Sequence, residues 1–443
     1  MSAHQAGLSA RQYKAGRNGG GFSDCHEHGC SHVANLYQRL LPLVRRTWER
    51  GDRPVFTNVW YVAARSEDLQ DKPLKVRMLG CDFVLYREPG GKAVCLSNVC
   101  PHRGGSLAHG KCKDDGSIAC PYHAWSFNGE GKCTQIASRR DEDPQDVAPG
   151  VKIDAYPTEE KYGFIWAFLG DEPENAAPII EMPEFDDDGF RSTTTHSEVW
   201  ETNYHWAKFS NLDLVHLPVV HGIKFQNQDN PDSPPPFELT EHDDGFDLVY
   251  YPSTSRPRKG GEWDKIRDGD EAKKVESRMK FRVAGISLYG KVEIGGVGSG
   301  MHNVFYEFST PIDDQTTAMY YIFFRNFMLQ PELDEEHLKR NLMQARQDKA
   351  IAEAQQPRIA PVGPDPNGLY TYDEDSEIRL YWNLMGSMRE RGWQIDRKAW
   401  AEALAAGHYR AIPSPVRKKD PKGWVHDEVP RYAKGTTFAT AAA

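Results

Sequence analysis

The chain has 443 residues, of which 39% are hydrophobic and 27% are charged, so it is long enough for two or three domains with large cores. Its formal net charge of −10 argues against nonspecific nucleic-acid binding. No apolar run reaches the roughly 18 residues of a membrane span, and residues 1–21 lack the apolar core of a signal peptide. We therefore expect no membrane partner, no nucleic-acid partner and a cytoplasmic location.

The N-terminal 32 residues are poor in hydrophobic side chains and rich in Gly, Ser and His, which predicts a flexible tail. Five Cys or His residues fall within Cys25–His32, but no second ligand pair lies nearby to close a metal site. We interpret this segment as a tail without metal. The next stretch, 36–49, repeats apolar residues at spacings of three and four and predicts an amphipathic helix.

From Phe56 onward the pattern changes to short β segments separated by turn-forming residues. The predicted strands are 60–63, 74–78, 83–86 and the apolar run 164–169, with a hairpin turn at 128–131. Three prolines and several acidic residues then mark 171–183 as a linker.

Two loops interrupt this β region, and each carries one cysteine and one histidine: Cys100 with His102, and Cys120 with His123. Thiolate and imidazole ligands in this mixed order suit a two-iron, two-sulfide cluster, in which one iron takes both cysteines and the other takes both histidines. A tetrahedral zinc ion uses the same residue types, but zinc fingers usually place both cysteines in one knuckle. The mixed loops therefore favour the cluster, and Trp125 is placed to shield it from water.

A second region, rich in β-branched and aromatic residues, follows the linker. Its predicted strands are 246–251, 275–283, 286–294, 304–309 and 318–324, with loops at 226–236 and 252–274. A helix is predicted to begin at Asp334, after Pro331, and to stop before Pro357. Another helix is expected over 382–404 with a break at Gly392, and 412–430 is expected to be irregular.

This second region contains a further group of metal-binding side chains. Asp213 and His216 are three residues apart, so on a helix they share one face, whereas His221 is about 140° away from His216 at 100° per residue. Pro218 between the two histidines can break the helix and bring His221 back. Two histidines and one carboxylate form the ligand set of non-haem ferrous oxygenases. Asp348 in the late helix is the candidate carboxylate, although its spacing alone indicates a solvent-facing charge.

Taken together, these motifs resemble the oxygenase (α) subunit of Rieske non-haem iron oxygenases, from about Trp60 to the late helix. The cluster motif is carried by Cys-Pro-His-Arg at 100–103, then seventeen residues after His102, then Cys-Pro-Tyr-His-x-Trp at 120–125. Residues 162–166 resemble the closing strand of the family's Rieske domain, and 201–221 resemble its iron motif. The segment 348–356 resembles the phthalate-type branch, which includes O-demethylases such as vanillate demethylase.

The resemblance implies a role for each matched residue. Cys100, His102, Cys120 and His123 would hold one [2Fe–2S] cluster, and His216, His221 and Asp348 would hold one mononuclear Fe(II). Asp213 would carry the electron by bridging His216 to the cluster ligand His123 of a neighbouring subunit, which implies a homotrimer; a carboxylate beside a metal-bound imidazole is also sound second-sphere chemistry. Electrons from NADH or NADPH would arrive through a separate flavin and iron–sulfur reductase, with or without a ferredoxin.

Two positions depart from the family pattern. Ala124 stands where relatives mostly carry Gly. Asn211 lies two residues before Asp213, whereas relatives more often place this Asn three or four residues before it, so we prefer Asn203 as the polar residue near the site.

We predict an α+β protein in which an N-terminal all-β Rieske [2Fe–2S] domain precedes a C-terminal helix-grip catalytic domain, an antiparallel sheet with helices. The predicted division is a tail 1–32, a helical lead-in 33–55, the Rieske domain 56–170, a linker 171–197, the catalytic domain 198–410 and an extension 411–443.

The expected activity is hydroxylation or O-demethylation of a methoxylated or carboxylated aromatic substrate by dioxygen, as the oxygenase component of a monooxygenase system. The substrate is expected against the apolar strands 281–294 and 301–327. Arg282 and Arg325 are candidates for a substrate carboxylate, but each is more readily interpreted as part of a structural salt bridge. The alternatives are the α subunit of a dihydroxylating dioxygenase and, from another class, an electron-transfer or regulatory subunit with an inactive second domain.

Overall fold

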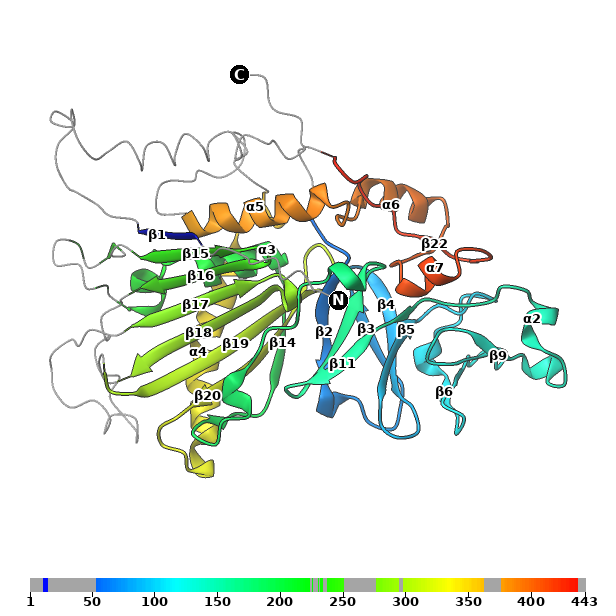
Figure 1. The fold of residues 1–443 in the computed structure, drawn as a ribbon, viewed down its shortest axis with the longest axis horizontal. Helices are drawn as coiled ribbons and strands as arrows, with labels where there is room; N and C mark the ends of the chain where they lie inside the picture. The colour runs from blue at the N-terminus through cyan, green and yellow to red at the C-terminus, as the bar shows by residue number, and fades with distance from the viewer. Residues whose placement is uncertain are drawn as a thin grey trace, which may run out of the picture.

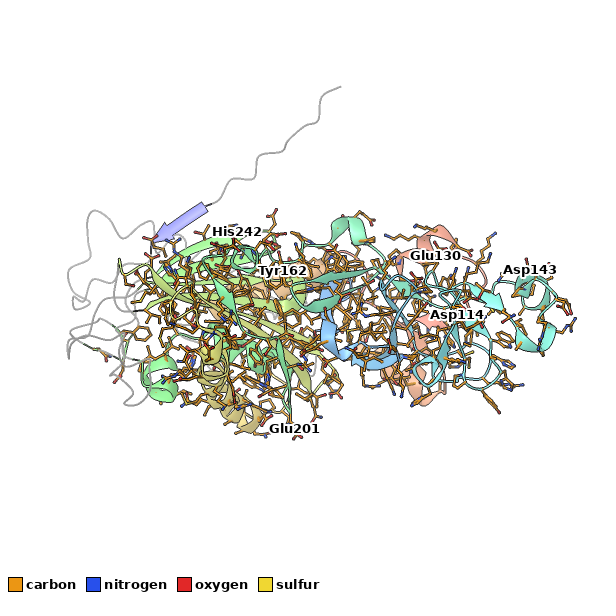
Figure 2. The ribbon with its side chains drawn as sticks, turned by 90° about the horizontal axis from the view of Figure 1, so that it is seen from below. Asp114, Glu130, Asp143, Tyr162, Glu201 and His242 are labelled. Atoms are coloured by element: carbon orange, nitrogen blue, oxygen red, sulfur yellow. The ribbon has the colours of Figure 1, made fainter. Side chains whose placement is uncertain are left out.

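The fold was analysed in a computed structural model, which describes residues 11–14, 53–223, 237–250, 276–294, 298–361 and 376–436, together with 225, 230, 232 and 233. An N-terminal β domain and a larger domain built on an antiparallel sheet lie side by side (Figure 1). In a view turned by 90°, Asp114, Glu130 and Asp143 lie in the β domain, whereas Glu201 and His242 lie in the other domain (Figure 2). Tyr162, in the turn between β11 and β12 of the β domain, lies beside the second domain. The predicted α+β class and domain order are confirmed.

The N-terminal domain consists of three small sheets, with strand orders β10-β5-β4-β3, β11-β12-β2 and β6-β7-β8-β9. Its elements are β2 Val59–Arg65, β3 Leu74–Met78, β4 Cys81–Arg87, β5 Ala93–Ser97, β6 Lys111–Cys112, β7 Ile118–Ala119, β8 Ser126–Phe127, β9 Cys133–Gln135, α2 Pro144–Val147, β10 Ala155–Tyr156, β11 Thr158–Lys161 and β12 Phe164–Leu169. The sequence predicted β3 and β12 with these bounds, and the turn between β8 and β9 lies at the predicted hairpin.

Strand β12 joins the two domains, which explains its uninterrupted apolar sequence. Ile165, Ala167 and Leu169 belong to the largest core cluster, which contains much of the β domain. Phe164 and Trp166 face the other way and pack edge-on against Phe308 of the large sheet. A strand that is covered on both faces has no polar face, so alternation is lost.

The second domain is a nine-stranded antiparallel sheet with order β1-β15-β16-β17-β18-β19-β20-β13, and β14 also pairs with β20. Its strands are β1 Arg11–Lys14, β13 Arg191–Ser192, β14 His196–Trp200, β15 Glu238–His242, β16 Gly245–Tyr250, β17 Ser277–Arg282, β18 Ser287–Ile294, β19 Met301–Pro311 and β20 Thr317–Arg325. All five strands predicted here are present. Strand β1 falls in the tail for which we expected no structure, and β13 falls inside the expected linker.

One face of this sheet packs on the β domain and the other is covered by helices. Val304, Tyr306 and Phe308 of β19 face the β domain, whereas Phe305 and Phe323 face α3 and α4. The helices are α3 Tyr204–Leu212, α4 Asp334–Ala354, α5 Ser376–Glu390, α6 Arg397–Ala405 and α7 Pro415–Lys419, with a π-helical turn at Leu217–His221 and a parallel pair of bridging strands, β21 Arg410–Ala411 and β22 Asp427–Glu428.

The late helices confirm two predictions. Helix α4 begins at Asp334, with three acidic residues in its first turn, and ends three residues before Pro357. The helix expected over 382–404 is interrupted at Gly392, whose φ of +78° is left-handed, so it forms the separate helices α5 and α6. In the part of the chain described here, no helix is long and apolar enough to cross a membrane.

The C-terminal segment returns to the N-terminal domain. The Arg417 guanidinium donates to both carboxylate oxygens of Asp154 at 2.8 and 2.7 Å, and both side chains are buried. Tyr156 donates its hydroxyl to the carbonyl oxygen of Ile412 at 2.7 Å. Val416 packs against the core that contains Cys100 and Cys120. The segment has little regular structure, as expected, but it completes the N-terminal domain.

Several predictions lie outside the described residues. They concern the Cys25–His32 segment, the helix 36–49, most of the loop 226–236 and the excursion 252–274.

Candidate active site

The two cysteine-histidine loops are closed by the same pair of backbone hydrogen bonds. In the first loop, Cys100 N donates to Gly105 O and Gly104 N donates to Cys100 O, each at 2.9 Å. In the second loop, Cys120 N donates to Trp125 O at 2.8 Å and Ala124 N donates to Cys120 O at 2.9 Å. A Cβ atom on Gly105 would lie 2.8 Å from Cys120 Sγ, so the two loops face each other closely.

The side chains between these loops fit a two-iron, two-sulfide cluster. The His102 and His123 rings lie 4.6 Å apart, and His102 Nδ1 is buried without a hydrogen-bond partner among the described residues. A buried nitrogen in this state requires a ligand. Cys100 and Cys120 are almost fully buried, and burial raises the pKa of the Cys100 thiol to about 12, so a thiolate there requires a bound cation. Trp125 stacks on His102 with ring centroids 4.4 Å apart and shields that side of it.

The matched loops explain why Ala124 is an unusual residue. Gly104 and Ala124 occupy equivalent positions, four residues after each cysteine, and have φ values of +70° and +54°. A left-handed backbone suits glycine and strains alanine. Alanine in place of glycine at position 124 therefore strains the backbone locally and leaves the cysteine and histidine positions unchanged.

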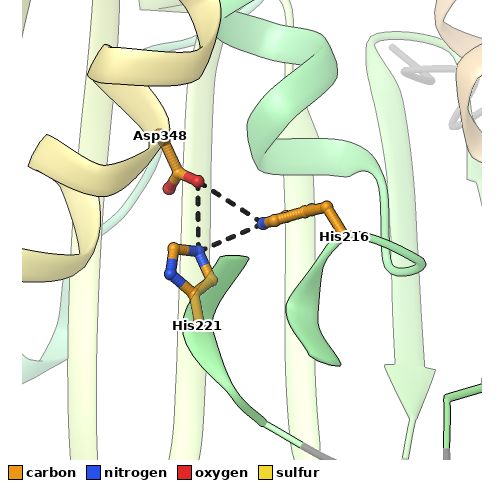
Figure 3. Close-up of side chains that lie close together, drawn as sticks. All are labelled: His216, His221 and Asp348. Atoms are coloured by element: carbon orange, nitrogen blue, oxygen red, sulfur yellow. Dashed lines mark hydrogen bonds and ion pairs between the residues drawn. The ribbon is translucent and has the colours of Figure 1, made fainter. Parts of the chain in front are cut away.

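Three side chains of the second domain converge on one point. His216 Nε2 lies 3.1 Å from His221 Nε2, and the Asp348 carboxylate oxygen Oδ1 lies 3.4 Å from the first nitrogen and 3.1 Å from the second (Figure 3). Two cis ligands of an octahedral ion, each about 2.1 Å from the metal, are roughly 3 Å apart. The three atoms thus have the spacing of one face of an octahedron. They form the one such group of His, Cys, Asp and Glu ligands found among the described residues.

The far nitrogen of each imidazole donates to an acceptor oxygen, which directs Nε2 toward the metal position. His216 Nδ1 donates to the carbonyl oxygen of Asp213 at 2.7 Å, and His221 Nδ1 donates to Gln347 Oε1 at 2.9 Å. Burial raises the pKa of the Asp348 carboxyl, but hydrogen bonds from the two imidazoles bring it below its ordinary value. The carboxylate is therefore ionised at neutral pH.

The environment of Asp213 differs from the expectation. Helix α3 ends at Leu212, and Asp213 is extended, with φ −63° and ψ 124°, so Asp213 and His216 do not share a helix face. The Asp213 carboxylate accepts the Val215 backbone N–H at 2.7 Å, an Asx turn that ends the helix, and its Oδ2 lies 3.8 Å from His216 Nδ1. The main chain, and not the carboxylate, makes the short contact with His216.

The predicted departure from a straight helix between the two histidines is confirmed. Residues Leu217–His221 form a π-helical turn that contains Pro218, and Gly222, with φ +68°, ends it. Our preference for Asn203 over Asn211 is wrong. Asn203 caps the far end of α3, where its side chain accepts from His205 N, whereas Asn211 lies at the end next to the ligands.

Other side chains near the triad were not predicted. Gln347 carries no sequence signal beyond its position next to Asp348. Lys208 and Glu307 form a buried ion pair with a 2.6 Å contact, and Asn211 Nδ2 donates to the second Glu307 oxygen at 3.1 Å. Lys208 and Asn211 are three residues apart on a predicted helical segment, and this shared face is the signal from which the pair could have been found.

The interpretation of Arg282 and Arg325 as members of salt bridges is confirmed. Arg282 contacts Asp247 at 2.6 Å, and the fully buried Arg325 contacts Asp334 at 2.8 Å.

Comparison with known proteins adds two family matches. Residues 59–156 match the Rieske [2Fe-2S] domain, and residues 204–384 match the vanillate O-demethylase oxygenase C-terminal domain. The chain therefore combines a Rieske [2Fe-2S] domain with a vanillate O-demethylase oxygenase C-terminal domain. Accordingly, the N-terminal domain is called the Rieske domain below.

Curated relatives of the Rieske oxygenase type align over part of their length. The chain is 35% identical to aminopyrrolnitrin oxygenase of Pseudomonas fluorescens over 37% of this chain and 46% of that protein. It is 33% identical to the oxygenase component of dicamba O-demethylase from Stenotrophomonas maltophilia over 38% of this chain and 48% of that protein. The chain thus spans about half the length of these relatives.

Solved structures share the fold. The crystal structure of dicamba monooxygenase bound to dicamba matches with a TM-score of 0.62 and 21% identity, over 76% of this chain and 98% of that chain.

Proposed function

We propose that the chain is the oxygenase component of a Rieske non-haem iron monooxygenase system. The observation that carries this proposal is the convergence of His216, His221 and Asp348 at 3.1–3.4 Å in a chain that also has paired cysteine-histidine loops. An electron-transfer subunit with an inactive second domain has no need for this convergence.

The chain's own residues would prepare two metal sites. When bound, the cluster would supply single electrons and the mononuclear iron would activate dioxygen. Cys100, Cys120, His102 and His123 would hold the cluster, and Trp125 covers one face of His102. At the triad, the carbonyl of Asp213 and the side chain of Gln347 keep the protons of both imidazoles on Nδ1. Three protein ligands on one face leave positions open on the other.

The aromatic side chains on the sheet face that α3 and α4 cover are the evidence for an aromatic substrate. Phe305, Tyr321 and Phe323 lie on this face, in the same core cluster as Ala345 and Ala352, which flank Asp348 on α4. We propose hydroxylation or O-demethylation of a methoxylated or carboxylated aromatic compound. The named activities of relatives include dicamba and vanillate O-demethylation, and a dioxygenase α subunit also occurs among them. The comparisons do not favour the dihydroxylating alternative.

We also propose a homotrimer in which His123 of one subunit approaches Asp213 of the next. Both sides of this contact are accessible and carry apolar side chains. Tyr122, next to His123, is 66% exposed, and Val219, between the two triad histidines, is 83% exposed. Burial of these two side chains between subunits would favour such a contact. A flavin and iron–sulfur reductase, alone or with a ferredoxin, would deliver electrons from NADH or NADPH.

Product analysis tests this function. The purified protein is supplied with a reductase, NADH and a panel of methoxylated and carboxylated aromatics, and the products are identified by mass spectrometry. We expect a demethylated or hydroxylated product that requires dioxygen. Formation of no oxygenated product from any aromatic, by protein with both sites filled, would contradict the proposal.

The role of Asp213 is tested in the same assay. We expect Asp213→Ala to keep both metal sites filled and to lose nearly all turnover, because the path between subunits is cut. Glu335→Ala is the control, because it removes an exposed carboxylate that pairs with Lys339 on α4, and it should retain activity. Normal turnover by Asp213→Ala would show that electrons take another route.

A further inference from the structure

A cluster of polar side chains is buried between α3 and the sheet, close to the triad. It consists of Lys208, Asn211, Glu307 and Tyr321. Lys208 and Glu307 are 0% and 3% exposed and pair at 2.6 Å, and Asn211 binds the other oxygen of Glu307. Tyr321 is directly opposite Glu307 in the β19–β20 ladder, so both side chains are on the same face of the sheet.

Two polar atoms of this cluster have no partner. The Tyr321 hydroxyl and Asn211 Oδ1 are both buried without a hydrogen bond among the described residues, and Tyr321 is only 2% exposed. A buried polar atom without a partner costs about 1–3 kcal/mol. The cluster therefore offers one hydroxyl and one amide oxygen that a ligand can satisfy.

The cluster lies within electrostatic range of the triad. The Asp348 carboxylate adds to the rise in the pKa of Glu307 and in the pKa of Tyr321, although burial is the largest cause of both rises. Asn211 lies on the last turn of α3, immediately before the segment that carries His216 and His221. A molecule that contacts Tyr321 and Asn211 is consequently placed beside the triad.

The cation of the cluster, and two others on this side of the sheet, already have anionic partners. Lys208 pairs with Glu307, Arg325 with Asp334, and Arg346 with Glu198. A substrate carboxylate can only accept hydrogen bonds, so it cannot satisfy Asn211 Oδ1, and burying it beside cations that are already paired costs free energy. A neutral hydroxyl can both accept a hydrogen bond from Tyr321 and donate one to Asn211 Oδ1.

We propose that Tyr321 and Asn211 form the recognition site for a neutral hydrogen-bonding group of the substrate, such as a phenol hydroxyl, and that this site discriminates against a carboxylate. This inference rests on the proposed function and narrows its substrate class. The Tyr321 hydroxyl donates to the oxygen of the substrate hydroxyl, and that hydroxyl donates its hydrogen to Asn211 Oδ1. The Lys208–Glu307 pair holds Asn211 in place through the bond to its Nδ2 atom.

Binding measurements without turnover test the inference. The iron-loaded protein is titrated calorimetrically under nitrogen with 2-methoxyphenol, 2-methoxybenzoate and methoxybenzene. The first compound carries the neutral hydroxyl, the second replaces it by a carboxylate and the third lacks both. We expect 2-methoxyphenol to bind roughly tenfold more tightly than either of the others, which corresponds to one well-formed pair of hydrogen bonds.

Two variants locate the effect. Tyr321→Phe removes one hydroxyl and should reduce the advantage of 2-methoxyphenol over methoxybenzene roughly fivefold or more, with the affinity for methoxybenzene unchanged. Tyr320→Phe is the matched control, because its hydroxyl points to the opposite face of the same strand and donates to Ala63 O. It should leave all three affinities unchanged. Iron content and the visible spectrum report whether each variant is folded.

The outcomes separate this inference from the proposed function. Tighter binding of 2-methoxybenzoate than of 2-methoxyphenol, or an unchanged preference in Tyr321→Phe, overturns the recognition site and leaves the oxygenase function standing. Binding of none of the three compounds by protein with both metal sites filled overturns the recognition site together with the aromatic substrate class. The preference of the wild-type protein is decisive even if a variant fails to fold.

Discussion

The two proposed metal sites of this chain are built in opposite ways. The cluster ligands come from two loops that are neighbours in sequence, between Cys100 and His123, and the loops are closed by the same backbone hydrogen bonds. The triad unites a turn after α3 with α4, and Gln347, next to Asp348, is 126 positions from His221. The first site depends on local turn geometry, whereas the second depends on how a helix packs against the rest of its domain.

Removing one ligand from each site should remove a different part of the bound iron. We expect Asp348→Ala to lower iron from about three to about two atoms per chain with sulfide unchanged, and His102→Ala to leave about one iron and no sulfide. Product formation should fall roughly 10³-fold or more in both. Elemental and acid-labile sulfide analysis measure the contents. Glu335→Ala, which removes an exposed carboxylate of α4, is the control. Three irons in Asp348→Ala would remove Asp348 from the site.

The domain that holds the cluster loops also depends on one contact with a distant segment, the Arg417–Asp154 pair. Arg417→Met leaves a buried carboxylate without its cation, and we expect a loss of about 3–5 kcal/mol in the stability of the Rieske domain. Denaturation followed through the visible circular dichroism of the cluster measures this loss. The double variant Asp154→Asn with Arg417→Met removes both charges and should recover most of it. Equal stability of all three proteins would show that the C-terminal segment does not support the domain.

Acid should weaken the helix-covered domain through two buried imidazoles. Burial lowers the pKa of His205 and of His337 to about 3. Below about pH 6.5 the unfolded chain binds protons that the folded chain does not, so the free energy of unfolding falls as pH decreases toward 3, by about 1.4 kcal/mol per pH unit for each histidine. Denaturation of His337→Gln between pH 7.5 and 5 should show a shallower pH dependence than wild type. Identical slopes would exclude His337 as a contributor.

The smallest expected change in stability comes from exchanging alanine and glycine at equivalent positions of the two cluster loops. Ala124→Gly relieves a left-handed alanine and should stabilise the Rieske domain by up to about 1 kcal/mol. Gly104→Ala is the reverse change at the equivalent position, where a Cβ atom meets no atom within 4 Å, and it should cost a similar amount. Thermal unfolding measures both. Shifts of the same sign would show that the loops are not equivalent.

Sequence patterns predicted the parts of this molecule whose structure is determined by residues close together in the sequence. The strand bounds 74–78 follow from local alternation, and the bounds 164–169 follow from an uninterrupted apolar run. The start of α4 follows from its helix-start residues, and the break at Gly392 follows from glycine conformation. Asp348 was reached only through the family resemblance, because nothing near it in sequence indicates that α4 approaches the two histidines.

Neither the hydrogen-bond partner of Asp213 nor the contacts between distant segments could be predicted from the sequence. The Asx turn at Asp213 ends α3 at Leu212, before the segment 213–216 that the shared-face argument required to be helical. A carboxylate can bond either another side chain or nearby backbone, and the sequence does not indicate which. The Lys208–Glu307 pair and the return of the C-terminal segment both depend on tertiary packing, for which single residues carry no pattern.

The same return has a consequence for biosynthesis. Asp154 and Arg417 are 263 positions apart, so the ribosome makes the last support of the Rieske domain long after its strands. At about 5–20 residues per second, this interval is roughly 10–50 s. During that time the Asp154 carboxylate has no guanidinium beside it, and Val416 is missing from the core that contains Cys100 and Cys120. The Rieske domain is thus completed only after the whole of the following domain, residues 204–384, has been translated.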